Sequence, residues 1–390
     1  MRPETFRGER AGRLRRVGHG EGAYWAFVPH PLPPKLSYTS SLIRLLSEAD
    51  RAVGELSGLG QTMDEESANL FVAPLIRREA VLSSRIEGTR ADLEELYLYE
   101  AGARVADEAD VREVHNYVRA LEYGLAQIKD PKGLPLSLRL LREVHSRLME
   151  GVRGEHATPG EFRRTQNWIG PPGSTLQTAT FIPPPPDDLM PALDNFEKYL
   201  HAKDEHPPLV RLAFVHYQFE AIHPFLDGNG RIGRLLIALL LVEWKLLSHP
   251  LLYLSAFFER HRQEYYDRLQ AVSQEGAWEA WVEFFLRGVA EQAADTAERI
   301  KRLQALQKKW RELLRHETRS TNALRLVDML FRKPTVTVPQ VQEELGLPYR
   351  SSARTLVLRL VDLGILVPVA GQNRPRRFEA RDIVQLLSVK

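Results

Sequence analysis

The segment between residues 223 and 234, HPFLDGNGRIGR, constrains this chain more than any other. Apolar stretches with helical spacing lie on both sides of it, at 208–222 and 231–247. Gly228, Asn229 and Gly230 tolerate left-handed backbone conformations and stand just before the second stretch. Consecutive main-chain amides at a helix N-terminus bind anions. The sequence therefore predicts a helix–loop–helix corner with a phosphate-binding loop.

The charged side chains of the same segment suit a nucleotide. Arg231 and Arg234 are three residues apart on the first helical turn and match a polyphosphate. Asp227 is a hard oxygen ligand, suited to Mg²⁺ held beside phosphates. His223 ends the preceding helix, and its imidazole can accept a proton near neutral pH. These residue types indicate a phosphoryl- or nucleotidyl-transfer site.

Two other interpretations of the glycines are weaker. Gly228, Gly230 and Gly233 also match the spacing of a dinucleotide-binding motif, but that motif follows a strand and here a helix precedes it. No GxxxxGK[ST] loop occurs in the sequence. A purely structural corner with surface arginines is disfavoured by the density of glycine and charge.

The twelve residues resemble the HxFx(D/E)GNGRxxR signature of the Fic family at every signature position, and the similarity extends over about 40–290. The resemblance implies a protein adenylyltransferase. His223 would take the proton from a target hydroxyl, which attacks the α-phosphorus of ATP and releases pyrophosphate. Gly230 stands where phosphorylating relatives carry a lysine, which favours AMP transfer. De-AMPylation, or transfer of another nucleotidyl or phosphoryl group, is the alternative.

The same resemblance assigns roles around the nucleotide. Asp227 would hold Mg²⁺, Arg231 the β-phosphate and Arg234 the γ-phosphate. The nucleotide-binding set implied in this way comprises Gly228, Asn229, Gly230, Arg231, Ile232, Gly233, Arg234 and, on a later helix, the adenine contact Tyr266. His216, seven residues before His223, is interpreted as a packing histidine.

A possible inhibitory helix lies earlier in the chain. A helix is expected over about 74–86, and Ser83 and Glu87 lie four residues apart on one face. This pair alone is a weak signal, but with Gly88 it resembles the family's inhibitory (S/T)xxxE(G/N) helix. The resemblance implies that Glu87 pairs with Arg234 and blocks the γ-phosphate position.

The proline-rich region 151–187 contains a β-prone run, 178–182, expected to form a short hairpin. The resemblance implies a flap that receives an extended target segment by strand addition. Thr180, Phe181 and Ile182 are the flap residues expected there.

Residues 320–390 predict a winged helix-turn-helix. Helices are expected at 322–331, from the N-cap Thr337 onward and at 349–363, followed by a two-stranded wing. The region holds eleven basic and six acidic residues. Arg350 and Arg354 on the third helix, with Arg374, Arg376 and Arg377 in the wing, suit duplex DNA. A protein-binding module is the other interpretation.

The chain has no cysteine, which excludes disulfides and Cys-ligated metals. Its first residues lack the apolar stretch of a secretory signal, and the apolar run 235–242 is too short to cross a membrane, so a cytoplasmic location and no membrane contact are expected. The other partners expected are the target protein, the chain itself through auto-AMPylation, and a second copy in a homodimer.

The expected fold is mainly α: a Fic-type helical core with a short β-hairpin flap, plus the C-terminal winged helix. The expected divisions are an irregular N-terminal arm (1–38), a helical region with the inhibitory helix (39–105), the catalytic core (106–290), a connector helix (291–319) and the winged helix (320–390). A DNA-binding regulator that uses the core as a nucleotide sensor, and a toxin-like growth inhibitor, are the functional alternatives.

Overall fold

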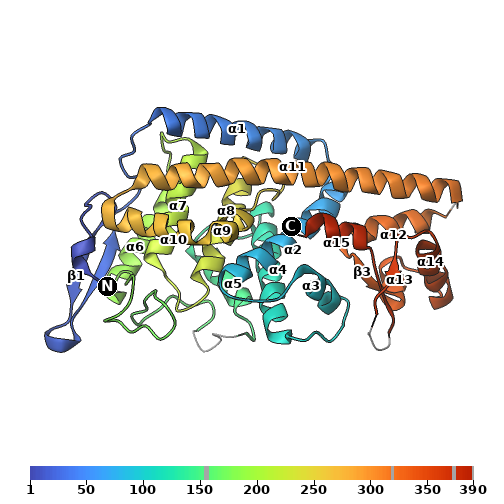
Figure 1. Ribbon diagram of the computed structural model, residues 1–390, viewed down its shortest axis with the longest axis horizontal. Helices are drawn as coiled ribbons and strands as arrows, with labels where there is room; N and C mark the ends of the chain where they lie inside the picture. Colours follow the sequence, from blue (N-terminus) through green and yellow to red (C-terminus); the bar gives the residue numbers. More distant parts are fainter. Residues whose placement is uncertain (153–157, 318–319, 371–374, 389–390) are drawn as a thin grey trace. The chain divides into compact units, whose positions relative to one another are not determined.

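A computed structural model of the chain describes residues 1–152, 158–317, 320–370 and 375–388. The described residues are mainly helical with two small sheets, which confirms that the fold is mainly α (Figure 1). It divides into two compact units. Unit 1 comprises residues 1–57 and 119–294, and unit 2 comprises residues 58–118 and 295–390.

The elements follow one another in a largely helical order. The helices are α1 (Ser40–Gln61), α2 (Glu65–Ile86), α3 (Leu93–Glu100), α4 (Glu108–Lys129), α5 (Leu138–Leu148), α6 (Pro186–His201), α7 (Pro208–Ile222), α8 (Asn229–Glu243), α9 (Ser255–Arg260), α10 (Arg262–Glu275), α11 (Trp278–Glu317), α12 (Thr321–Arg332), α13 (Val338–Glu344), α14 (Arg350–Asp362) and α15 (Arg381–Leu387). The strands are β1 (Gly12–Val17), β2 (Tyr24–Pro29), β3 (Thr335–Thr337), β4 (Val367–Pro368) and β5 (Arg377–Glu379). Among the described residues, no helix is long and apolar enough to cross a bilayer.

The N-terminal residues, expected as an irregular or extended arm, form a β-hairpin. β1 and β2 pair antiparallel, from Gly12 opposite Pro29 to Val17 opposite Tyr24. The strand β2 is anchored because Phe27 is buried, donates its amide to the Ile182 carbonyl at 2.8 Å and packs its ring on Phe181. Scattered arginines on β1 conceal this pairing in the sequence, and the partner that buries β2 lies about 150 residues away.

The helices α7 and α8 form the helix–loop–helix corner that the sequence predicts. α7 is buried along nearly its whole length and ends at His223, whose φ of 49° and ψ of 60° are left-handed. α8 begins at Asn229, after Gly228 with φ of 76°. The two helices approach closely at Gly233, where a Cβ would lie 2.3 Å from Glu220 Oε1. A side chain at position 233 would have to displace the Glu220 carboxylate and would crowd the Phe219 ring, 3.2 Å from the added Cβ.

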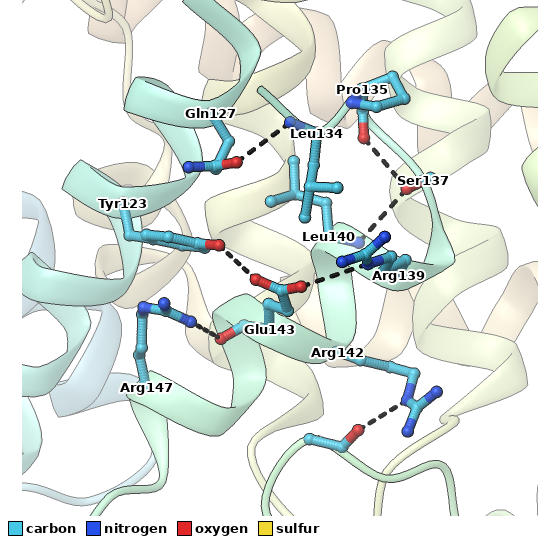
Figure 2. Close-up of polar contacts among 11 residues, drawn as sticks. Tyr123, Gln127, Leu134, Pro135, Ser137, Arg139, Leu140, Arg142, Glu143 and Arg147 are labelled. Carbon is cyan, nitrogen blue, oxygen red and sulfur yellow. Dashed lines mark hydrogen bonds and ion pairs between the residues drawn. The ribbon is translucent and has the colours of Figure 1, made fainter. Parts of the chain in front are cut away.

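The helix α5 is held against α4 by a polar cluster (Figure 2). Tyr123 on α4 donates a hydrogen bond to the Glu143 carboxylate on α5, and the Arg147 guanidinium lies 3.3 Å from the centre of the Tyr123 ring. Arg139 contacts the other Glu143 oxygen at 3.4 Å. The buried residues of α5 include Val144, His145 and Leu148, and the helix contacts α8.

In unit 2, the helix α2 is longer than the expected 74–86. Asp64 caps its start by accepting a hydrogen bond from the Ser67 amide at 2.7 Å. The helix continues through Pro74 because its first half is also buried, with Phe71 packed edge-on against Phe331 of α12 at 6.0 Å. Burial thus overrides the local cost of proline inside a helix.

The C-terminal residues fold as α12, β3, α13, α14, β4, β5 and α15, with an antiparallel sheet in the order β3-β5-β4 (Figure 1). Thr337 caps α13 as expected, and Gln340 completes a capping box with it. The sequence did not indicate the three-residue strand β3 or the helix α15. Arg374 lies outside the described residues.

Candidate active site

His223 lies at the corner between α7 and α8 and is half-buried. Its Nδ1 is 3.3 Å from the Glu220 carbonyl oxygen. Because a carbonyl only accepts, Nδ1 carries the proton of the neutral ring, and Nε2 is then the nitrogen in the acceptor state. The ring is therefore in the tautomer that a general base at Nε2 requires.

Asn229 closes the loop that follows His223. Its Oδ1 accepts from the Phe225 amide at 2.8 Å, and its Nδ2 donates to the Phe225 carbonyl at 2.8 Å. The Phe225 ring is fully buried. The Asn229 side chain therefore has a structural role. Its main-chain amide is the part that is a candidate for an anion hole at the start of α8.

Two buried arginines and one exposed carboxylate surround the loop. Arg231 and Arg234 lie on the first turn of α8 and are only 4% and 3% exposed. The Asp227 side chain is 51% exposed, with Oδ1 3.9 Å from Arg231. Guanidinium groups at a helix N-terminus make a strongly positive site, suited to phosphate oxygens.

A metal at this site would depend on the nucleotide. Among the described residues, no cluster of three or more His, Asp or Glu side chains is able to hold a metal ion. Asp227 offers an exposed carboxylate beside the loop. Mg²⁺ is commonly bound by one or two carboxylates together with substrate phosphates, so Asp227 fits such an ion only in the company of a nucleotide.

Arg163 and Asn167, which hold the main chain of the loop, were not predicted from the sequence. Arg163 is buried and donates to the carbonyls of His223 at 2.9 Å and Ile222 at 3.3 Å. Asn167 donates to the carbonyls of His223 at 3.3 Å and Phe225 at 2.8 Å. Burial lowers the pKa of Arg163 to about 10, which still leaves it charged at neutral pH. Because both residues follow a proline- and glycine-rich pattern without periodicity, a single sequence does not single them out.

The expected flap segment is only partly available to a partner. Of the three expected flap residues, Phe181 and Ile182 are buried and Thr180 is exposed. An antiparallel bridge pairs Phe181 with Ile169, inside the region 151–187 where a short hairpin is expected. Arg163 also donates to the Pro184 carbonyl at 2.6 Å. The segment after the flap and the His223 main chain are therefore joined by one guanidinium.

Among the remaining candidates in unit 1, Tyr266 lies on α10 and is 40% exposed. His216 is buried, as expected of a packing histidine, with Nε2 2.8 Å from the Tyr265 hydroxyl and Nδ1 3.2 Å from the Gly233 carbonyl. Burial lowers the pKa of His216 to about 3, so its ring is neutral.

The expected inhibitory residues lie at the end of α2, in unit 2. Ser83 is buried, Glu87 is exposed at the C-cap, and Gly88 has φ of 100°. The glycine therefore takes the left-handed conformation that commonly ends a helix. The pairing of Glu87 with Arg234 stays a prediction.

Comparison with known families agrees with this geometry. Residues 43–126 match the Fic/DOC family N-terminal profile, and residues 135–241 match the Fic/DOC family profile. The chain contains Fic/DOC family domains. The second of them includes α5, α7, the loop with His223 and most of α8.

Two curated relatives resemble this Fic/DOC region. "Protein adenylyltransferase Fic" from Culex quinquefasciatus is 34% identical over 175 residues, which cover 44% of this chain and 31% of that protein. The protein of the same name from Aedes aegypti is 32% identical over 186 residues, which cover 46% of this chain and 34% of that protein. The chain therefore matches about a third of the length of these relatives.

Two solved structures share the fold. A Fic family protein from Desulfovibrio desulfuricans G20 superposes with a TM-score of 0.55 at 20% identity, covering 90% of this chain and 98% of that one. Fic-1 from C. elegans gives a TM-score of 0.52 at 21% identity, covering 69% and 74%. The likeness supports a Fic-type arrangement of the helices.

Proposed function

We propose that this protein is an adenylyltransferase that transfers AMP from ATP to a Ser, Thr or Tyr hydroxyl of a target protein. One observation carries the proposal: a histidine in the acceptor tautomer at Nε2 stands beside a glycine loop and two buried arginines. The relatives' name, protein adenylyltransferase, supports the same chemistry.

His223 starts the reaction by taking a proton. Its Nε2 accepts the proton of the target hydroxyl, whose oxygen forms a bond to the α-phosphorus of ATP while the bond to the pyrophosphate oxygen breaks. The amides of Gly228, Asn229 and Gly230, with Arg231 and Arg234, bind the phosphates and stabilise the developing charge. Mg²⁺ at Asp227 would supply further positive charge to the phosphates. Ile232 and Gly233 complete the nucleotide segment, and Tyr266 contacts the adenine.

Inhibition by α2 belongs to the same proposal. Glu87, with Ser83 and Gly88, would pair with Arg234 and occupy the γ-phosphate position, so that the resting enzyme is slow. The main chain at Thr180, Phe181 and Ile182 would dock an extended target segment, and the enzyme itself is a further substrate. Removal of AMP, with Glu87 positioning water, is the alternative reaction at this site.

The C-terminal residues are proposed to be a winged helix that contacts duplex DNA. The order of helices and the small sheet support the first part. Arg350 and Arg354 lie exposed on α14, and Arg376 is exposed before β5. Arg377, by contrast, is only 4% exposed and donates hydrogen bonds to the carbonyls of Ala101 and Gly102. It therefore has a structural role, and the expectation that it contacts DNA is wrong.

Intact-mass spectrometry after incubation with ATP and Mg²⁺ tests the reaction. We expect the Glu87→Gly protein to gain the mass of one or more AMP groups, because the block on Arg234 is removed. The matched Glu87→Gly, His223→Ala protein should gain none, since no base remains. A gain in both proteins would exclude His223 as the base, and no gain in either would refute AMP transfer to itself and the inhibitory role of Glu87.

A further inference from the structure

The side chain of His145 on α5 contacts the loop between α7 and α8. It is fully buried, and its ring stacks on the Phe225 ring with centres 3.8 Å apart and planes within 5°. Its Nε2 is 3.1 Å from the Asp227 carbonyl oxygen, and its Nδ1 is 2.8 Å from the Gly160 amide nitrogen. His145 is thus the link between three segments that are far apart in the sequence.

The hydrogen bonds fix which nitrogen carries the proton. The Gly160 N–H can only donate, hence Nδ1 accepts. Nε2 therefore carries the hydrogen and donates it to the Asp227 carbonyl. Both ring nitrogens have a fixed role in orienting the chain.

The bond to Asp227 orients the next amide. In a planar trans peptide, the carbonyl of one residue and the N–H of the next point in opposite directions. Since the Asp227 carbonyl points toward His145, the Gly228 N–H points away from it, and it donates to Asp227 Oδ1 at 2.6 Å. A negatively charged oxygen thus already stands where this amide is aimed.

The surroundings of His145 leave the loop little freedom. A Cβ at Gly228 would lie 3.0 Å from Met149 Sδ and 3.4 Å from His145 Nε2, so the loop backbone rests directly on α5. Gly160 is held from its other side by Arg142, whose Nε donates to its carbonyl at 2.7 Å. Figure 2 shows Arg142 reaching from α5 toward this segment. The support is therefore a continuous chain from Arg142 through Gly160 and His145 to Asp227.

We propose that His145 is a positioning residue that orients the Asp227–Gly228 peptide so that the Gly228 N–H faces a phosphate oxygen of the nucleotide. It acts through the loop and does not touch the reacting atoms. The inference rests on the proposed function only for what this amide binds. The orientation of the amide itself is a property of the chain alone.

Two substitutions of His145, made in the full-length Glu87→Gly protein, test the roles of its two ring nitrogens separately. Glutamine places its amide nitrogen near Nε2 and keeps the donor to Asp227, whereas asparagine places its oxygen near Nδ1 and keeps only the acceptor for Gly160. We expect His145→Asn to weaken ATP binding by about tenfold, the effect of roughly one charge-assisted hydrogen bond, and His145→Gln to weaken it less. Arg139→Gln, on the outer side of α5, is the control for unchanged binding.

Hydrogen exchange tests the orientation without nucleotide. Deuterium uptake in the peptide containing Gly228 should be faster in His145→Asn than in His145→Gln, at equal melting temperatures. Equal uptake in the two variants, or a change that follows the loss of melting temperature in both, would overturn the inference. A parent protein that neither binds ATP nor gains AMP would instead refute the proposed function, and the exchange result would still stand.

If His145→Asn does not fold, Arg142→Met tests the same support of the loop, because Arg142 is exposed and its replacement is less disruptive to the core. It removes the hydrogen bond to the Gly160 carbonyl and should raise exchange in the same peptide. Unchanged exchange in Arg142→Met would overturn the inference.

Discussion

Arg163 shows how a single buried side chain can set the geometry of a loop. α7 ends at His223, whose backbone is left-handed. The Arg163 guanidinium donates hydrogen bonds to the carbonyl groups of Ile222 and His223 at this helix end. A positive charge at the C-terminal end of a helix is also electrostatically favourable. Strain at His223 is thus compensated by contacts from outside the motif.

Replacing Arg163 with methionine is expected to destabilise the protein by about 3 kcal/mol, since several buried carbonyls lose their donor. The neighbouring Arg164, whose side chain is 86% exposed, offers the matched control. Arg164→Met should change stability by less than about 0.5 kcal/mol. Urea unfolding of both variants measures the difference, and equal midpoints would exclude this role for Arg163.

The buried His216 predicts a pH dependence of stability. Its pKa is lowered to about 3 in the folded protein, against 6.5 for the ordinary side chain, because it is buried. Because the pKa is lowered on folding, neutral His216 contributes fully to the free energy of unfolding above about pH 6.5. This contribution is lost as the pH falls toward 3, since the unfolded state gains the proton first. The loss approaches about 1.4 kcal/mol per pH unit inside this window.

The measurement compares the free energy of unfolding at pH 7.5 and pH 5.5 for the natural protein, His216→Gln and His201→Gln. We expect the drop toward pH 5.5 to be smaller in His216→Gln than in the natural protein. The exposed His201 is the control, and its variant should retain the full drop. Identical pH dependence in all three would contradict the assignment.

At the scale of elements, the end of α3 in unit 2 is bonded by side chains from α13 and the C-terminal sheet. The last carbonyls of a helix have no partner within it. Here Arg377 of β5 donates to the carbonyls of Ala101 and Gly102, and Gln340 of α13 donates to that of Glu100 at 3.4 Å. The C-terminal sheet and α13 thus serve as the cap of α3.

Adjacent arginines allow this cap to be tested. Arg377→Leu should lower the free energy of unfolding by about 2 kcal/mol, because it leaves buried carbonyls without a donor. Arg376→Leu removes an exposed charge next to it and should change stability by less than about 0.5 kcal/mol. The cap would be rejected if thermal and urea unfolding did not distinguish the two variants.

At the scale of the whole molecule, the question is whether the chain couples a nucleotide site with a nucleic-acid site. The basic residues that remain candidates for DNA are few, because Arg359 is engaged by Glu317 at 2.8 Å and Arg377 is buried. Arg350 and Arg354 are exposed four residues apart on α14. A phosphate contact from each would make binding strongly dependent on salt.

Fluorescence anisotropy of the full-length protein with a labelled duplex, at 50 mM and 200 mM salt, tests this surface. We expect weaker binding at the higher salt, and a smaller salt dependence in the Arg350→Gln, Arg354→Gln protein, since each lost phosphate contact reduces the slope by about one. Arg359→Gln, which removes one positive charge from the same helix, is the control for a loss of charge away from the two proposed phosphate contacts. Weak binding that is insensitive to salt would favour a protein partner for the module.

Much of the local structure could be predicted from the sequence because it depends on local chemistry. Helical periodicity, the N-cap at Thr337 and the glycines of the loop each act over a few residues, so the corner between α7 and α8 was predictable. The Fic signature likewise lies within twelve consecutive residues. The roles of these residues in catalysis remain predictions.

The tertiary structure alone decided what surrounds that loop. Arg163, Asn167 and His145 lie 58 to 82 positions from their partners in the loop, and nothing in their own neighbourhood indicates that these partners are main-chain carbonyls. The N-terminal hairpin and the buried state of Arg377 escaped prediction for the same reason. Their structural roles depend on burial against distant segments, and burial is a property of the folded chain.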